Sequence, residues 1–250
     1  MELGNLKDAG LARAVAAEAG ALLLDLRARG DLSGKALGDR GDRAADDLIQ
    51  ARLAAARPGE FVLSEESFDD RRRCAASRVW VVDPLDGTRE FIEGYDDWAV
   101  HVGLAIDGVP VNGAVAVPAR GLVFGTDDVP QVSGALPERP RMVVSRTRCP
   151  ALAEQVGEAL GAEMIRMGSA GAKAMAVVDG RADLYLHDGG QYEWDNCAPV
   201  AVALAAGLHA SRIDGSPLVY NCENPLLPDL LICRPELAVQ VLALVARFRT

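Results

Sequence analysis

The sequence is organised around thirteen residues, Val79 to Phe91, which read V-W-V-V-D-P-L-D-G-T-R-E-F. The β-branched and aromatic run at 79–82 predicts a short buried strand. Proline fixes its own backbone angle and lacks an N–H donor, so we expect this strand to end at Asp83-Pro84. The stretch therefore predicts a buried strand that opens into an acidic turn.

Two aspartates and a helix start follow that strand. Asp83 and Asp86 lie close together, and Gly87 permits a tight turn whose N–H groups face a ligand. Thr88 is a typical N-cap residue, so we expect a helix to begin behind it. Carboxylates beside a helix N-terminus suit a hard cation and a phosphate group. Asp-Pro and Asp-Gly are also ordinary turn dipeptides, so this pattern alone leaves a simple turn open.

Composition indicates a folded protein with a sizeable core. Half of the 250 residues are hydrophobic and a quarter are charged. No apolar run reaches membrane-spanning length, and the first residues lack the basic and apolar regions of a signal peptide. Five scattered cysteines without a C-x-x-C pair suit reduced thiols. We therefore expect a cytoplasmic protein with no membrane partner.

Charge narrows the range of partners. A net charge of −10 argues against a nucleic-acid polymer or an anionic membrane surface. It permits a small phosphorylated substrate, because carboxylates that bind a divalent cation become a locally positive site. The three histidines, His101, His187 and His209, are too sparse for a His-rich metal site. We expect each of them in the core or on the surface rather than as a ligand.

The first half of the chain predicts helices, a short strand and an antiparallel meander. Asp42 falls near the start of the second expected helix, where the helix dipole favours an acid even without a function. The charge run at 69–73 predicts a solvated loop. The expected helices cover 6–28 and 42–57, and the expected strands cover 61–63, 98–106, 111–117 and 121–126.

The second half of the chain has a different element order. Residues 127–140 are rich in Gly, Pro and charge and predict a boundary between two domains. Residues 142–186 then predict β-α-β-α-β, which is typical of a smaller α/β domain. A further helix is expected over 198–206, a last strand over 230–233 and a last helix over 235–247.

Three separate segments resemble the inositol monophosphatase superfamily of magnesium-dependent, lithium-sensitive phosphatases. Asp83-Pro84-Leu85-Asp86-Gly87-Thr88 matches its metal-binding motif. Glu65-Glu66 matches its paired glutamates, with Ser64 in place of the usual glycine. Trp194-Asp195 with Ala198 matches its W-D-x-x-A motif at the start of a helix. The three motifs occur in the family's order, and the resemblance covers nearly the whole chain.

The resemblance implies a layered α/β fold, the α-β-α-β-α sandwich of inositol monophosphatases and fructose-1,6-bisphosphatases. It implies an N-terminal α+β domain over 1–138 and a smaller C-terminal α/β domain over 139–250, with the site between them. Asp195 would then cross from the second domain to complete a site begun in the first. A homodimer is expected on the same basis.

The resemblance also assigns metal ligands. Glu65, Asp83 and the Leu85 carbonyl would hold a first Mg²⁺, and Asp83, Asp86 and Asp195 a second. Glu65 with waters would hold a third. An all-oxygen set of carboxylates suits Mg²⁺, and neighbouring ions can clamp the attacking and leaving oxygens of a phosphoryl displacement. We therefore expect two to three magnesium ions.

Water activation is assigned in the same way. Thr88, hydrogen-bonded to Asp42, would orient and deprotonate the attacking water, so that no phosphoenzyme forms. The N–H groups of Gly87 and Thr88 would hold the phosphate oxygens. This chain reads Asp39-Arg40-Gly41-Asp42 where the family usually has Thr-x-x-Asp, which makes Asp42 the least direct of these assignments.

The substrate is suggested by residues beside the motifs. Thr88-Arg89-Glu90-Phe91, and Glu193 before Trp194, resemble the 3′(2′),5′-bisphosphate nucleotidase branch. The resemblance implies hydrolysis of 3′-phosphoadenosine 5′-phosphate, a by-product of sulfate assimilation, to AMP and phosphate. Ser169 and Lys173 would touch the nucleotide, although Lys173 is equally a candidate for a solvated helix lysine. The residues expected to meet substrate are Glu65, Leu85, Asp86, Gly87, Thr88, Ser169, Lys173 and Asp195.

Other functions stay open at this point. Inositol monophosphatase or fructose-1,6-bisphosphatase activity is compatible with the same metal motifs. A catalytically silent sensor of metal or phosphate on the same fold is a further alternative, which the complete ligand set disfavours.

Overall fold

The computed structural model describes residues 3–132 and 134–249. The described α-helices are α1 (Asp8–Arg29), α2 (Gly34–Ala56), α3 (Thr88–Glu93), α4 (Ala151–Leu160), α5 (Ala170–Val178), α6 (Glu193–Ala205) and α7 (Pro235–Phe248). The strands are β1 (Phe61–Ser64), β2 (Arg78–Asp86), β3 (Ala99–Ile106), β4 (Val109–Val117), β5 (Leu122–Gly125), β6 (Arg141–Ser145), β7 (Glu163–Met167), β8 (Leu184–Tyr192), β9 (His209–Ser211) and β10 (Leu226–Cys233). Short 3₁₀ helices are η1 (Leu3–Asn5), η2 (Arg71–Ala75) and η3 (Pro118–Arg120).

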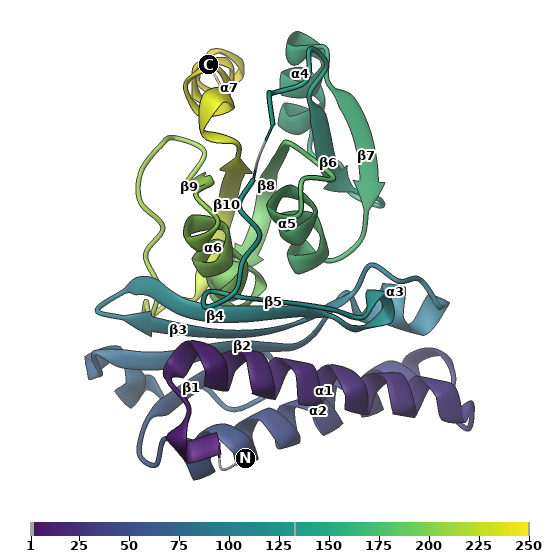
Figure 1. The fold of residues 1–250 in the computed structure, drawn as a ribbon, viewed down its shortest axis with the longest axis vertical. Coiled ribbons are helices and arrows are strands. Elements are labelled where there is room, and N and C mark those ends of the chain that lie inside the picture. Colours follow the sequence, from purple (N-terminus) through teal and green to yellow (C-terminus); the bar gives the residue numbers. More distant parts are fainter. Residues whose placement is uncertain (1–2, 133, 250) are drawn as a thin grey trace.

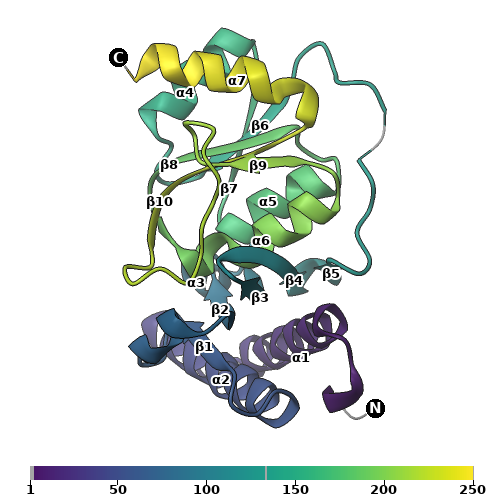
Figure 2. The same cartoon turned by 90° about the vertical axis from the view of Figure 1, so that its left-hand side faces the viewer.

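These elements stack in five layers (Figure 1). The helix pair α1 and α2 covers one face of a first sheet, and α5 and α6 lie between that sheet and a second one (Figure 2). Helices α4 and α7 cover the outer face of the second sheet. The expected α-β-α-β-α sandwich is confirmed.

The first sheet has the order β1-β2-β3-β4-β5. Strands β1 and β2 are parallel, and β2 to β5 form an antiparallel meander, as expected for this region. Its outer face packs on α1 and α2 through a core that includes Leu11, Val15, Trp80 and Val82. The hydrophobic periodicity of the long helices thus matches the face they bury.

Helix α6 lies unusually close to the inner face of the first sheet. A Cβ atom at Gly103 would come within 2.9 Å of the Ala198 backbone N, and one at Gly113 within 3.1 Å of the Ala198 Cα. Side chains at these strand positions would therefore push the helix away. The two glycines fix the height of α6 above the sheet, and with it the first turn of the helix that carries Asp195.

The second sheet has the order β7-β6-β8-β10-β9. Strands β7, β6 and β8 are parallel, and β10 is antiparallel to β8 and to β9. The last strand of the chain therefore lies inside the sheet rather than at its edge. Strand β9 was not predicted, because three residues at the end of an Ala-rich helix carry too short a pattern.

Helix α2 begins eight residues earlier than predicted, at Gly34 rather than at Asp42. The expectation that Asp42 lies near a helix start is therefore wrong. The intervening glycines pack rather than break the helix: a Cβ atom at Gly38 would come within 2.9 Å of the Thr88 Cγ2 atom, and one at Gly41 within 3.1 Å of Leu85 Cδ2. Both bring α2 against the acidic turn.

Strand β2 does not end at Asp83-Pro84 but continues to Asp86. Pairing with β3 is irregular between Asp83 and Asp86, so Pro84 occupies a bulge, where its missing N–H leaves no ladder bond unmade. Thr88 is the first residue of α3, and Gly87 with φ 88° is the N-cap, so the expected N-cap role of Thr88 is also wrong.

The charge run at 69–73 is not a solvated loop. It leads into η2, and the Arg73 side chain is completely buried. Besides the nearby Asp69, its partners lie about 150 residues further along the chain, out of reach of any local pattern.

None of the helices in the described residues is long and apolar enough to cross a membrane.

Candidate active site

Three carboxylates meet between the two sheets. Asp83 and Asp86 come from the bulged end of β2, and Asp195 comes from the first turn of α6. One carboxylate oxygen of each lies within 4.8 Å of the others. Asp83 and Asp86 are buried. Asp86 and Asp195, which are 109 residues apart in the sequence, are thus brought to one point.

Asp86 is held by two hydrogen-bond donors and a neighbouring histidine around one oxygen. Its Oδ2 accepts hydrogen bonds from the Ser169 hydroxyl and, at 2.7 Å, from the Gly171 N–H. The buried His101 Nε2 lies 3.2 Å from the same oxygen. Burial opposes ionisation, but the hydrogen bond and charge of His101 lower the pKa of Asp86 to about 2. Asp86 is therefore the constant negative charge of the cluster.

Burial and neighbouring negative charges disfavour ionisation of the other two aspartates, Asp83 and Asp195. Burial, followed by the charges of Glu65 and Asp86, raises the pKa of Asp83 well above its usual range. Burial and the Asp86 charge raise the pKa of Asp195 to about 6, although its Oδ2 accepts a 2.6 Å hydrogen bond from the Tyr192 N–H. A bound cation relieves this repulsion, and oxygen donors at this spacing suit a hard divalent ion. The donor set therefore fits a metal.

Glu65 lies just beyond the end of β1, at the solvent side of the cluster. Desolvation raises the pKa of Glu65 to about 7, as do the charges of Asp195 and Asp86. The residue as a whole is exposed, so a cation can reach its carboxylate from the solvent. Glu65 faces the acidic cluster but lies outside the set of three within 4.8 Å.

Thr88 and Asp42 lie beside the cluster. The Thr88 hydroxyl donates to the Leu85 carbonyl at 3.1 Å and lies 3.4 Å from Asp42 Oδ1, which is a long hydrogen bond. Burial and the charge of Glu66 raise the pKa of Asp42 to about 7, against the effect of Thr88. Asp42 reaches this position from the middle of α2, not from its end.

Gly87 is required by both conformation and space. Its φ of 88° is one that residues with a Cβ atom rarely adopt. A Cβ atom there would also lie 3.1 Å from Ser169 Cβ and 3.3 Å from the Trp98 Cα. The turn after Asp86 is therefore seated against the loop that opens α5.

A cleft of about 820 Å³ extends from the acidic cluster. Its walls come from α3, the loop after β6, the start of α5 and the length of β8. They include Asp86, Arg89, Glu90, Ser145, Thr147, Arg148, Cys149, Ser169, Lys173, Tyr185, His187, Gln191 and Asp195.

Lys173 is not a solvated helix lysine. The residue is buried, and its ammonium donates to the carbonyls of Gly168 at 3.0 Å and Ser169 at 2.6 Å. It lies 5.3 Å from the centre of the Tyr185 ring, on which a cation is attracted. Burial lowers the pKa of Lys173, which the carboxylate of Asp86 opposes. The amine of Lys173 thus lies in the cleft wall, held by two backbone carbonyls.

Ser169 serves the acidic cluster in this structure. Its hydroxyl donates to Asp86 and accepts from the Ala172 N–H at 2.9 Å, which caps α5. Its positive φ of 45° is unusual for a serine. Both hydrogen-bonding functions of the hydroxyl are therefore used within the protein.

Sequence reasoning did not identify Arg148, Tyr185 and His187 as wall residues of the cleft. Arg148 is exposed, and the Nε2 atom of His187 is buried with no protein partner among the described residues. Burial lowers the pKa of His187 to about 4, so the ring is neutral. No local signal marks these residues; only the fold of β8 beside the loop after β6 brings them together.

Comparison with known proteins gives the same family throughout. The model of the inositol monophosphatase family matches residues 8–246. The chain is 51% identical to a 3′-phosphoadenosine 5′-phosphate phosphatase of Mycobacterium leprae, covering 96% of this chain and 94% of that protein. It is 33% identical to the 3′(2′),5′-bisphosphate nucleotidase CysQ of Escherichia coli K12, over 74% of this chain and 80% of that protein.

A solved structure has the same fold. CysQ from Bacteroides thetaiotaomicron, described as a bacterial member of the inositol monophosphatase family, superimposes with a TM-score of 0.77 at 27% identity. The match covers 92% of this chain and 99% of that one.

Proposed function

Because this chain belongs to the inositol monophosphatase family, a family of phosphatases, we propose that it hydrolyses 3′-phosphoadenosine 5′-phosphate to AMP and phosphate. The similarity to a phosphatase of that name, at 51% identity over almost the whole chain, supports this substrate. The observation that carries the proposal is the meeting of Asp83, Asp86 and Asp195 at the end of a cleft that also holds Lys173 and Arg148. One end suits a metal-bound phosphate and the other a second anionic group.

The proposed metal sites take the ligands that the family resemblance implies, and the cluster of Asp83, Asp86 and Asp195 supports them. We propose that Glu65, Asp83 and the Leu85 carbonyl hold one Mg²⁺, that Asp83, Asp86 and Asp195 hold another, and that Glu65 takes part in a third. When bound, such ions polarise phosphate oxygens and make water more acidic. The protein contributes a fixed position for Asp86, which hydrogen bonds from Ser169 and Gly171 and the nearby His101 hold in place before any ion binds.

Proton transfer falls to Thr88 and Asp42. The Thr88 hydroxyl orients the attacking water and takes its proton, and Asp42 receives a proton from Thr88 in turn. A carboxylate whose pKa is about 7 accepts a proton readily at neutral pH, which suits a general base. The N–H groups of Gly87 and Thr88 stabilise charge on the phosphate oxygens. Attack is direct, with no covalent intermediate on the protein.

Recognition of the rest of the nucleotide belongs to the far part of the cleft. We propose that the Arg148 guanidinium pairs with the 5′-phosphate, because a guanidinium matches phosphate geometry and Arg148 is exposed to the cleft. The buried Lys173 adds positive charge, and Tyr185 and His187 offer flat surfaces to the base. Ser169 acts through Asp86 rather than on the nucleotide.

The test is phosphate release by the purified protein with Mg²⁺, using 3′-phosphoadenosine 5′-phosphate, inositol 1-phosphate and fructose 1,6-bisphosphate at equal low concentration. We expect a kcat/KM preference of about 100-fold for the nucleotide, equivalent to ~2.7 kcal/mol of transition-state discrimination. A flat profile, or a preference for a sugar or inositol phosphate, would overturn the substrate while leaving the metal chemistry in place.

Several finer properties stay predictions. These are inhibition by lithium, a role in sulfate assimilation, a cytoplasmic location, a homodimeric state and a division into domains near residue 138. Lithium titration of the activity and the mass of the native particle by light scattering test the first and fourth directly.

A further inference from the structure

Arg73 is a completely buried arginine that belongs to no part of the proposed chemistry. It lies in η2, which follows β1 and the segment that carries Glu65. Removing a guanidinium from water is costly unless it is fully paired. Its partners therefore indicate what the arginine does.

On one side, Arg73 pairs with Asp69. Its Nε lies 2.6 Å from one carboxylate oxygen and a terminal nitrogen lies 3.0 Å from the other, which is a two-pronged ion pair. Asp69 is four residues after Glu65 on the same segment. The pair therefore fixes the end of the segment that presents Glu65 to the acidic cluster.

On the other side, Arg73 binds a loop from the second half of the chain. Its second terminal nitrogen donates to Asn221 Oδ1 at 2.9 Å and to the Cys222 carbonyl at 3.0 Å. The Asn221 amide returns two hydrogen bonds, to the carbonyls of Arg73 at 2.9 Å and Ala76 at 3.2 Å. Asn221 has a positive φ of 61°, so the loop is held in one uncommon conformation.

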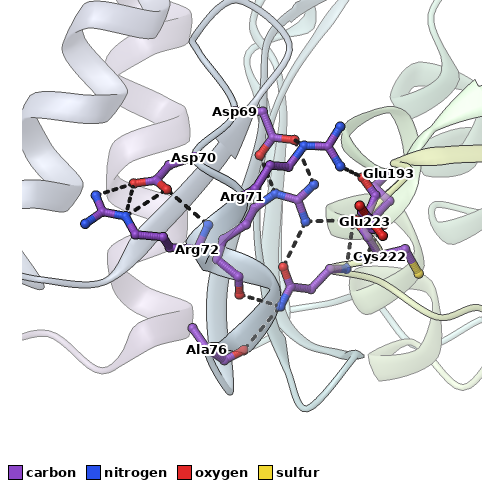
Figure 3. Close-up of polar contacts among 10 residues, drawn as sticks. Asp69, Asp70, Arg71, Arg72, Ala76, Glu193, Cys222 and Glu223 are labelled. Atoms are coloured by element: carbon purple, nitrogen blue, oxygen red, sulfur yellow. Dashed lines mark hydrogen bonds and ion pairs between the residues drawn. The ribbon is translucent and has the colours of Figure 1, made fainter.

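The same loop is bound from behind by Glu193. The Glu193 carboxylate is buried and accepts the backbone N–H of Asn221 at 2.7 Å and of Cys222 at 2.8 Å. Figure 3 shows this arrangement, with Asp69 on one side and Glu193 and Cys222 on the other. Glu193 is the first residue of α6 and lies two residues before Asp195.

Hydrogen bonds thus join the segment that follows Glu65 to the helix turn that carries Asp195. This path runs from the Glu65 segment through Asp69, Arg73, the 221–222 loop and Glu193 to the turn that carries Asp195. We propose that Arg73 is a positioning residue that sets the placement of Glu65 relative to Asp195 and thereby the affinity of the site for Mg²⁺. This inference rests on the proposed metal-dependent function.

The first variant is Arg73→Lys, which keeps the charge but lacks the planar fork that reaches Asp69 and the loop together. We expect the Mg²⁺ concentration for half-maximal activity to rise about 10-fold, with kcat at saturating Mg²⁺ within about threefold of the parent. The Mg²⁺ concentration needed to raise the Tm should increase by a similar factor. That thermal readout does not depend on turnover.

The matched control is Arg212→Lys. Arg212 makes the same two-pronged pair, with Asp229 at 2.6 and 2.7 Å, but within the second sheet region and away from the acids. This variant should lose thermal stability without changing the Mg²⁺ dependence. An equal loss of stability in both variants, with Mg²⁺ dependence unchanged in both, would make Arg73 a purely structural residue and overturn the proposal.

A second variant, Glu193→Gln, keeps the shape of the side chain and one oxygen that can accept a hydrogen bond from the 221–222 loop. It tests the same proposal if Arg73→Lys does not fold. It should raise the half-maximal Mg²⁺ concentration in the same direction. In the double variant the two effects should be less than additive, because both act through the 221–222 loop. Full additivity, or no effect of Glu193→Gln, would contradict the path.

The two proposals can fail separately. If the parent protein releases phosphate from none of the three substrates, the proposed function fails. The Mg²⁺-induced rise in Tm of parent and variants still decides the role of Arg73.

Discussion

The two ends of the cleft are built in different ways. At the acidic end, Asp83 and Asp86 lie on a bulged strand and Asp195 on the first turn of a helix, and backbone or buried donors fix the last two. At the far end, Arg148 lies exposed in the loop after β6, and residues 188–190 form a partly exposed stretch of β8. The proposed chemistry therefore lies on packed elements, and the proposed recognition lies partly on an exposed loop, whose sequence can change without disturbing the core.

This contrast separates reaction from substrate. In the proposed function, the acidic end binds the phosphate that all such esters share, and the far end binds the part of the substrate that distinguishes one ester from another. Variants at the two ends should therefore fail in different ways, and the predictions below test that division.

The largest effect is expected at the acidic end. Asp86→Asn removes the constant negative charge and turns an amide NH₂ toward the donors of Ser169 and Gly171. We expect kcat/KM to fall by at least ~10³-fold, or ~4 kcal/mol, for every substrate tested. The Mg²⁺-induced rise in Tm should be largely lost as well. Asp128→Asn, at an exposed ion pair with Arg13, is the control and should change neither quantity.

A smaller effect is expected beside the cluster. Thr88→Val keeps the shape that packs on Gly38 but removes the hydroxyl. We expect kcat to fall about 100-fold, the range of general acid–base catalysis, for all substrates and with an unchanged Mg²⁺-induced rise in Tm. Thr88→Ser retains the hydroxyl and should recover most of the rate. Full activity of Thr88→Val would exclude Thr88 from proton transfer.

The far end should show selectivity instead. Arg148→Ala should lower kcat/KM for 3′-phosphoadenosine 5′-phosphate about 10- to 30-fold, the range of one charge-assisted hydrogen-bonded contact. Adenosine 3′-phosphate, which lacks the 5′-phosphate, should be unaffected. Arg166→Ala, at an exposed arginine outside the cleft wall, serves as the control. An equal loss for both nucleotides would remove the proposed division of labour between the two ends.

The smallest effect concerns pH and stability without any substitution. The folded-state pKa values of Asp195 (about 6) and of Asp42 and Glu65 (about 7) lie above their ordinary values near 4. Protonation of these acids therefore stabilises the fold fully below about pH 4, and this contribution is lost as pH rises through 6 to 7. Asp86, whose pKa is lowered to about 2, has the opposite effect: its ionised carboxylate stabilises the fold above about pH 4, and this contribution is lost only as the pH falls towards 2.

Mg²⁺ should offset that loss by binding the ionised carboxylates. We expect 10 mM Mg²⁺ (roughly saturating) to raise the Tm by about 5 °C at pH 8 and by about 1 °C at pH 5. Differential scanning calorimetry at the two pH values, with the metal removed by a chelator, measures this. A larger rise at pH 5 than at pH 8 would mean that these acids are not the binding groups.

Sequence was sufficient where the required chemistry is local. The run from Val79 to Thr88 contains its own strand, its acids and its turn glycine, and the meander after it follows from alternation and turn residues. The five-layer fold came from resemblance carried by three motifs rather than from periodicity. Their order in the chain does not by itself place Asp195 beside Asp86.

The wrong predictions share a physical cause: at each of these positions, contacts with parts of the structure outside the local sequence pattern determine the conformation or the burial of the residue. Pro84 lies within a strand because the bulge there requires no hydrogen bond from its backbone nitrogen. Lys173 is buried because its Nζ donates hydrogen bonds to two carbonyls at the start of its own helix. The sequence predicted a solvated Arg73, but the residue is buried because the distant loop at 221–222 completes the hydrogen bonding that Asp69 begins. Helix α2 extends over Gly38 and Gly41 because α3 and β2 approach it closely there.

The place of β10 inside the second sheet has a consequence for synthesis on the ribosome. This strand is the last one made, yet it lies between β8 and β9 and directly follows the 221–222 loop. At ~5–20 residues per second, every acid of the site emerges seconds before the strand that completes the sheet beneath it. A chain that stops before Leu226 carries all of those acids and lacks the framework that aligns them.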